Sequence, residues 1–95
     1  IKMRISVRSM TSNSGNPVAN QFVIRTKDFR IFQSYSTTIA KILNSGKVFL
    51  DVDYWDYSAT TGKYRNQFLN EKIAATRKKI NNGEYILKDL NKWEW

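Results

Sequence analysis

The sequence predicts an α+β fold, an antiparallel sheet of four to six strands with one or two helices packed on one face. Apolar and polar residues alternate with a period of two through much of residues 1–51, as in half-buried strands. After residue 51 the apolar spacing changes to three and four, as on helices. The chain of 95 residues is 41% hydrophobic and carries three Trp, five Tyr and five Phe, which is enough for one core. We therefore expect a single domain over residues 1–95.

The first two strands are predicted from alternation and from the turn residues between them. The apolar positions of the first strand alternate with polar and basic ones, which predicts one apolar and one cationic face: Ile1, Met3, Ile5 and Val7 against Lys2, Arg4, Ser6 and Arg8. The run TSNSGNP at residues 11–17 is typical of a loop. A second strand over residues 21–26 is expected to direct Phe22 and Ile24 inward.

Three further segments complete the predicted meander of four or five strands. Residues 29–36 predict a strand whose apolar face is formed by Phe29, Ile31 and Tyr35. Residues 37–43 are β-branched and apolar, which extends strand character across a bulge, with a short helix as the alternative. Residues 47–51 predict another strand, with Val48 and Leu50 on one face.

Helical features begin after the meander. Residues 58–61 offer N-cap side chains, and Tyr64 and Phe68 have the i, i+4 spacing of one helical face. Asn70, followed by Glu71, is expected to start a second helix. The sequence therefore predicts two short helices rather than one long one.

The end of the chain predicts a helix stop and a final strand. The apolar stripe of the second helix continues to Ile80, and Gly83 is the expected C-terminal stop. Residues 85–87 predict a short strand. Trp93 and Trp95 are expected to form either a packed lid or an exposed patch.

The net charge of +8 is concentrated in the strand half of the chain. Residues 1–47 hold eight Lys or Arg against one acidic residue, whereas residues 48–95 hold eight against seven. A basic sheet face attracts polyanions such as nucleic acid or an acidic protein surface. Cations on strands also discourage aggregation, so this second interpretation stays open.

Catalytic chemistry is not indicated. The chain has no Cys and no His, so it lacks the commonest general base and the commonest transition-metal ligands. The run Thr60 to Lys63 matches two residues of a phosphate-binding loop, but Tyr57 and Tyr64 replace the other residues that the motif requires. We expect no catalytic residue and no cofactor.

A calcium site is considered and not favoured. Three carboxylates occur close together in the sequence, at Asp51, Asp53 and Asp56. Trp55 occupies the fifth position of the corresponding loop, and Gly62 occupies the position where a Glu would complete it. We therefore expect no metal, and expect these carboxylates to pair with Lys63 or Arg65.

The candidate partner-binding residues are basic residues of the strands and helices together with two tyrosines of the aromatic run. They are Arg4, Arg8, Arg25, Arg30, Tyr54, Tyr57, Lys63, Arg65, Arg77, Lys78 and Lys79. Tyrosines beside cations can stack bases or anchor a protein contact. The alternative is structural: Trp55 points inward and the run fills the junction between sheet and helix, while residues 77–79 form a solvated helix end.

Several stretches between residues 16 and 85 resemble one family of small proteins. They include NPVANQF at 16–22, FQSY at 32–35, YWDYS at 54–58, TTGKYR at 60–65 and GEY at 83–85. That family is carried by phages and mobile elements of Gram-positive bacteria, and most of its members have no assigned function. Related modules resemble anti-defence proteins, including anti-CRISPR inhibitors of RNA-guided nucleases.

The resemblance implies a non-enzymatic phage or mobile-element inhibitor that binds a bacterial defence nuclease (a Cas effector) or its guide-RNA complex. A basic inhibitor cannot imitate a phosphate backbone, so it would contact guide RNA or an acidic protein face. The alternative is a stand-alone module that binds DNA or RNA directly. No apolar stretch approaches the length of a membrane span, and the lack of Cys fits the cytosol of a bacterial host.

Overall fold

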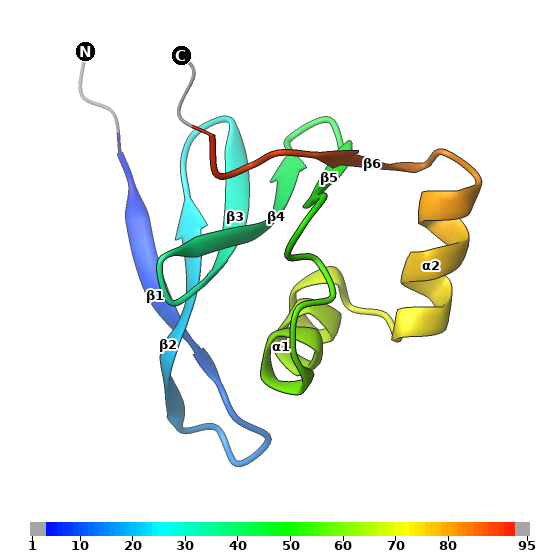
Figure 1. Cartoon of the computed structure of the whole chain (residues 1–95). Coiled ribbons are helices and arrows are strands. Elements are labelled where there is room, and N and C mark those ends of the chain that lie inside the picture. Colours follow the sequence, from blue (N-terminus) through cyan, green and yellow to red (C-terminus); the bar gives the residue numbers. More distant parts are fainter. Residues whose placement is uncertain (1–3, 93–95) are drawn as a thin grey trace.

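A computed structural model describes residues 4–92 and shows a six-stranded sheet with two helices (Figure 1). The strands are β1 (Ser6–Thr11), β2 (Pro17–Arg25), β3 (Phe29–Ser34), β4 (Thr37–Leu43), β5 (Val48–Asp51) and β6 (Tyr85–Lys88). The helices are α1 (Ala59–Leu69) and α2 (Ile73–Asn81). This arrangement is the α+β fold that the sequence predicts.

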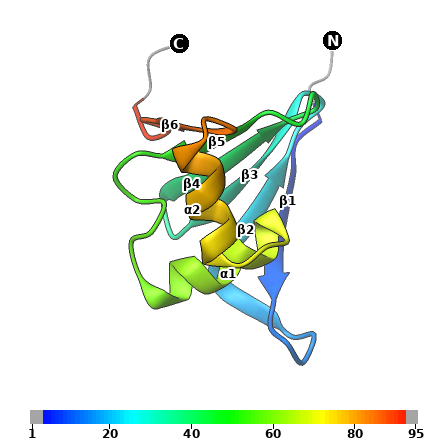
Figure 2. The ribbon, with the colours of Figure 1, turned by 90° about the vertical axis from the view of Figure 1, so that its right-hand side faces the viewer.

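The strands lie side by side in chain order, and β1 to β5 form an antiparallel meander. β6 departs from the predicted arrangement because it pairs with β5 in parallel. Parallel neighbours need a crossover of a dozen or more residues, which residues 52–84 supply with both helices. The helices lie in front of the sheet in Figure 2, so the crossover covers one face.

The core lies between the helices and this covered face. Phe32, Ala40 and Leu50 lie in one row across β3, β4 and β5, and each is fully buried. The ring of Phe68 in α1 packs 6.0 Å from the ring of Phe32. The register shifts within the pairing of β3 with β4, where Ile39 is the extra residue and is also buried. The predicted bulge is thus present and turns a second apolar side chain into the core.

The apolar alternation of the first strands faces away from the helices, which corrects the sequence prediction. Val7, Ile24 and Ile31 form a cross-strand row on the open face. Phe22 shares that face with Ile24, whereas Val23 pairs with a core residue and packs against the core. Both faces of β2 carry apolar side chains, so alternation alone does not show which face the helices cover.

Two residues that were expected inside elements stand at turns instead. Tyr35, expected to share a strand face with Phe29 and Ile31, follows the end of β3 and has φ = 55°. Asn70, expected to start the second helix, also has φ = 55° and caps the end of α1. Asparagine adopts this left-handed conformation at low cost, which suits a helix C-terminus. α2 begins only after its N-cap, Lys72.

Ile1 and Met3 of the predicted first strand, together with Trp93 and Trp95, lie outside the described residues. Within residues 4–92, neither helix has the length and apolar composition needed to cross a membrane.

Candidate anion-binding surface

Three of the predicted strand arginines meet in one hollow of about 660 Å³, here called the arginine hollow. Arg25 and Arg30 are direct cross-strand partners on β2 and β3, and Arg8 comes from the neighbouring edge strand β1. Gln67 and Phe68, near the C-terminal end of α1, also line it. The hollow therefore lies on the helix-bearing side of the sheet, beyond the end of α1.

The charge in the arginine hollow is uncompensated. Within residues 4–92, no ion pair involves Arg8, Arg25 or Arg30. The guanidinium of Arg30 instead lies over the ring of Phe68, 5.9 Å from its centroid. Like charges placed directly opposite each other on neighbouring strands repel. An anion entering the hollow would relieve this repulsion and could accept hydrogen bonds from several guanidinium groups.

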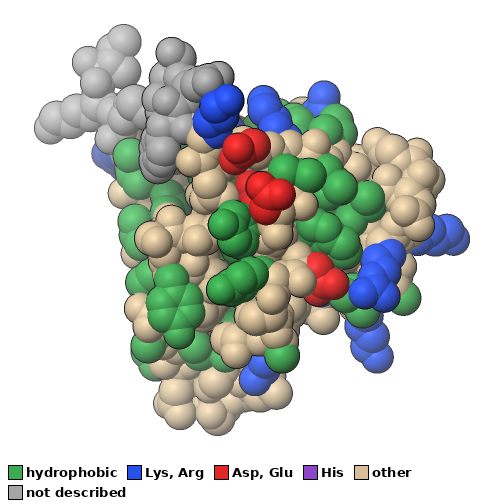
Figure 3. Space-filling view, viewed as in Figure 1, with side chains coloured by type: hydrophobic (Ala, Val, Ile, Leu, Met, Phe, Trp, Pro, Cys, Tyr) green, Lys and Arg blue, Asp and Glu red, His purple; other side chains and the backbone are tan. Residues whose placement is uncertain are grey.

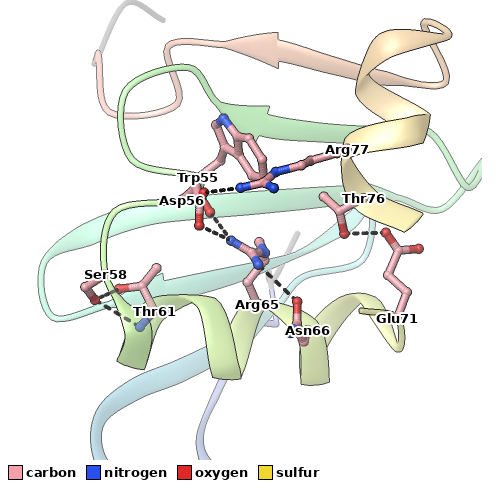
Figure 4. Close-up of polar contacts among 9 residues, drawn as sticks. All are labelled: Trp55, Asp56, Ser58, Thr61, Arg65, Asn66, Glu71, Thr76 and Arg77. Atoms are coloured by element: carbon pink, nitrogen blue, oxygen red, sulfur yellow. Dashed lines mark hydrogen bonds and ion pairs between the residues drawn. The ribbon is translucent and has the colours of Figure 1, made fainter. Parts of the chain in front are cut away.

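Arg65 does not belong to the surface, although it was a candidate binding residue. Its side chain is only 1% exposed and is held by three acceptors. It donates to the carbonyl of Trp55 at 2.8 Å, the carboxylate of Asp56 at 3.2 Å and the side-chain oxygen of Asn66 at 3.0 Å (Figure 4). The structural alternative is therefore the observed one: Arg65 fixes the loop before α1, with Trp55 half-buried against the core.

The remaining cations of the candidate set lie apart from the arginine hollow. Arg4 is exposed and precedes β1, and Lys63 is exposed on α1. Arg77 on α2 reaches the carboxylate of Asp56 at 3.4 Å, and Lys78 is exposed beside it. In Figure 3, Lys and Arg side chains lie both along the top edge and at the right, near α2, and hydrophobic side chains cover much of the left.

Lys79 belongs to a polar cluster that ties α2 to β6. The Glu71 carboxylate accepts from Lys79 at 2.7 Å, from the Thr76 hydroxyl at 2.6 Å and from the Tyr85 hydroxyl at 2.8 Å. Burial alone would raise the pKa of Glu71, but these hydrogen bonds outweigh it and hold the pKa below its usual value. The bond to Glu71 raises the pKa of Lys79. Burial, and then the bond to Glu71, raise the pKa of Tyr85. This cluster is a structural clamp rather than an open site.

The carboxylate of Asp51 likewise accepts hydrogen bonds that stabilise the fold. It accepts from the backbone N–H groups of Asp53, Tyr54 and Leu90 and from the side-chain amide of Asn91. These bonds join the loop after β5 to the segment after β6. In the described part of the chain, no three acidic side chains gather as they would around a metal ion.

The aromatic candidates belong to a second hollow, of about 460 Å³, here called the tyrosine pocket. Tyr54 and Tyr57 are 39% and 68% exposed, and their rings meet edge to face with centroids 5.5 Å apart. Tyr35 joins them from the β3–β4 turn and is 64% exposed. Tyr35 was not among the candidates. The available signal was a two-residue connection, Tyr35–Ser36, between two strand-like runs with no glycine to form the turn.

A family described as a family of unknown function, DUF8033, matches residues 5–85. No curated protein and no solved structure matches the chain.

Proposed function

The chain belongs to the DUF8033 family of unknown function, and we propose that it is a non-enzymatic protein that binds the phosphate backbone of a nucleic acid. The observation that carries this proposal is the arginine hollow. Arg8, Arg25 and Arg30 meet there, exposed and without an acidic partner among the described residues.

Phosphate suits this hollow for two physical reasons. A guanidinium presents a planar fork of donors that matches two phosphate oxygens, so several forks together favour a chain of phosphates. The surplus of +8 over the whole chain also attracts a polyanion from a distance. A single small anion would leave most of this charge without a role.

The sequence resemblance supports a narrower proposal for the nucleic acid. We propose that it is the guide RNA of a bacterial RNA-guided nuclease, and that the chain blocks the nuclease by occupying the guide complex. No bond is made or broken by the inhibitor in this mode of action. The broader alternative is a stand-alone module that binds DNA or RNA for another purpose.

The arginine hollow can be tested by the salt dependence of binding to a labelled 20-nucleotide single-stranded RNA, measured by fluorescence anisotropy. The test variant is Arg8→Gln/Arg25→Gln/Arg30→Gln. The matched control, Lys47→Gln/Lys72→Gln/Lys88→Gln, removes the same charge from exposed positions that do not line the hollow. Each lost phosphate contact lowers the slope of log K against log salt by about 0.7, so the test variant should lose about 2.

The expected result is a shallower slope for the test variant and a much smaller change for the control. Equal slopes for the two variants, or no salt-dependent binding by the unaltered protein, would overturn the proposal. A nuclease-protection assay against RNA-guided nucleases then separates the two partners. Protection that is lost in the test variant supports the guide-complex proposal; RNA binding without protection supports the stand-alone module.

A further inference from the structure

The tyrosine pocket is lined by aromatic rings and by hydroxyl groups. Tyr35, Tyr54 and Tyr57 provide exposed rings from two separate segments, the β3–β4 turn and the loop before α1. The other residues that line it are Ser34, Thr37, Ile39, Ser58, Thr60 and Thr61. None of these side chains is charged, which distinguishes the tyrosine pocket from the arginine hollow. Its volume of about 460 Å³ lies within the range of small-ligand sites.

The backbone of Tyr35 is strained, and hydrogen bonds hold it in place. Its φ of 55° lies in the left-handed region, which a bulky side chain rarely adopts. The Tyr35 N–H donates to the carbonyl of Asn20 at 2.6 Å, and its own carbonyl accepts from the Gln33 amide at 2.7 Å. Gly or Asn would form the same turn at lower cost. A strained residue that presents an exposed ring points to a role for that ring.

The hydroxyl groups that line the pocket fall into two sets, one held by hydrogen bonds and one without a hydrogen-bond partner in the described part of the chain. The Thr61 hydroxyl lies 3.4 Å from the Ser34 hydroxyl and accepts from the Ser58 hydroxyl at 3.1 Å. Figure 4 shows Ser58 and Thr61 together at the N-terminal end of α1. The hydroxyls of Thr37 and Thr60 have no hydrogen bond to any residue within 4–92. Because a hydroxyl both donates and accepts, these two groups can meet either kind of polar edge on a ligand.

We propose that the tyrosine pocket binds an unpaired nucleobase of the nucleic acid whose backbone occupies the arginine hollow; this inference rests on the proposed function. A nucleobase is flat and uncharged, which suits stacking on the tyrosine rings, and its edge is polar, which suits the hydroxyl groups. The pocket has neither the carboxylate nor the amide groups that distinguish one base from another, so it would accept any base.

The two sites lie at opposite ends of α1. Ser58 and Thr61 contribute to the tyrosine pocket, whereas Gln67 and Phe68 line the arginine hollow. Phe68 lies ten positions after Ser58, which is about 15 Å along a helix. One single strand of a few nucleotides can reach from one site to the other, whereas the bases of a duplex are paired and stacked inside it. The protein should therefore prefer single-stranded RNA to a duplex.

The test compares a 12-nucleotide RNA with a strand of the same length and charge that carries abasic positions. The unaltered protein should bind the complete strand about tenfold more tightly, since stacking one base on an aromatic ring has an effect of this size. The test variants are Tyr35→Asn and Tyr57→Ala, and Val7→Ala is the control because Val7 has a similar exposure, 59%, on the open face of the sheet.

The Tyr35→Asn variant separates binding from folding. Asparagine tolerates the left-handed backbone, so the melting temperature should not fall while the preference for the complete strand is lost. A Tyr35→Phe variant keeps the ring and should keep the preference.

Each outcome has a defined meaning. If the tyrosine variants bind both strands like the unaltered protein while the arginine variant still binds weakly, the base pocket is excluded and the proposed function stands. The base pocket is also excluded, and the proposed function stands, if the tyrosine variants bind both strands more weakly by the same factor, because the pocket would then contact the backbone. If neither set of variants changes RNA binding, both proposals fail, and the rings would have to serve another ligand such as a protein side chain.

Discussion

Arg65 and the arginines of the arginine hollow place the same guanidinium group in opposite settings. Arg65 is 1% exposed and donates to three acceptors. Arg8, Arg25 and Arg30 are exposed and have no ion pair within residues 4–92. The difference decides which arginine serves the fold and which is available to a partner.

Buried and exposed guanidinium groups contribute differently to stability because they differ in hydration. A buried guanidinium loses its hydration, so it is tolerated only where protein acceptors replace the water. Once they do, removing it leaves unsatisfied those acceptors that water cannot reach. An exposed guanidinium keeps its hydration and contributes little to stability, and two of them facing each other across strands lower stability slightly. An anion that binds between two such groups offsets their repulsion.

The largest expected effect is the loss of Arg65. Arg65→Met keeps much of the aliphatic volume but removes the donor to the carbonyl of half-buried Trp55 and releases the loop before α1. We expect the free energy of unfolding to fall by about 3 kcal/mol. In a domain of this size that lowers the melting temperature by roughly 15 °C, measurable by circular dichroism.

The arginine-hollow variant is the control for this measurement. Arg8→Gln/Arg25→Gln/Arg30→Gln should unfold within about 0.5 kcal/mol of the unaltered protein, because exposed side chains without an acidic partner contribute little to stability. If both variants were equally unstable, the division into structural and binding arginines would be wrong.

A second, smaller effect is expected at the polar cluster of α2 and β6, and it depends on pH. Glu71→Gln removes the charge that accepts from Lys79, Thr76 and Tyr85, so we expect a loss of about 2 kcal/mol at pH 7. The pKa of Glu71 is lowered in the folded state, so its contribution is present above the unfolded pKa of about 4.3. It is lost as the pH falls through the lower folded pKa.

Urea unfolding at several pH values measures this directly. The difference between the unaltered protein and Glu71→Gln should be constant from pH 6 to 8 and shrink below about pH 4. A difference that persisted unchanged at pH 2 would show that packing, rather than the ionised carboxylate, is responsible.

Much of the fold follows from the sequence because local signals agree with one another. Ser58 caps α1 as predicted, since its hydroxyl accepts from the Thr61 N–H at 3.1 Å. Val48 and Leu50 share the buried face of β5. Residues 85–88 form the last strand, but its parallel pairing depends on where the two helices return the chain, which no local pattern encodes.

The site was only partly predictable for a related reason. The strand arginines stand out by charge, but their meeting in one hollow depends on the pairing of Arg25 with Arg30 and on the end of α1. The burial of Arg65 has a weak signal: it lies four residues after Thr61, and the two share the covered face of α1. Arginine is rarely fully buried, so this spacing alone does not predict that Arg65 is buried.

A still smaller change in stability is expected at Arg77, which shares the carboxylate of Asp56 with Arg65. Asp56 accepts from buried Arg65 at 3.2 Å and from Arg77, which is 61% exposed, at 3.4 Å. Arg77→Gln should change the free energy of unfolding by less than about 0.5 kcal/mol, because water replaces the lost donor. Chemical denaturation of the Arg77→Gln and Arg65→Met variants measures how much each of the two donors to Asp56 contributes to the free energy of unfolding. Similar losses would mean that Asp56, and not the burial of Arg65, determines the stability of the loop.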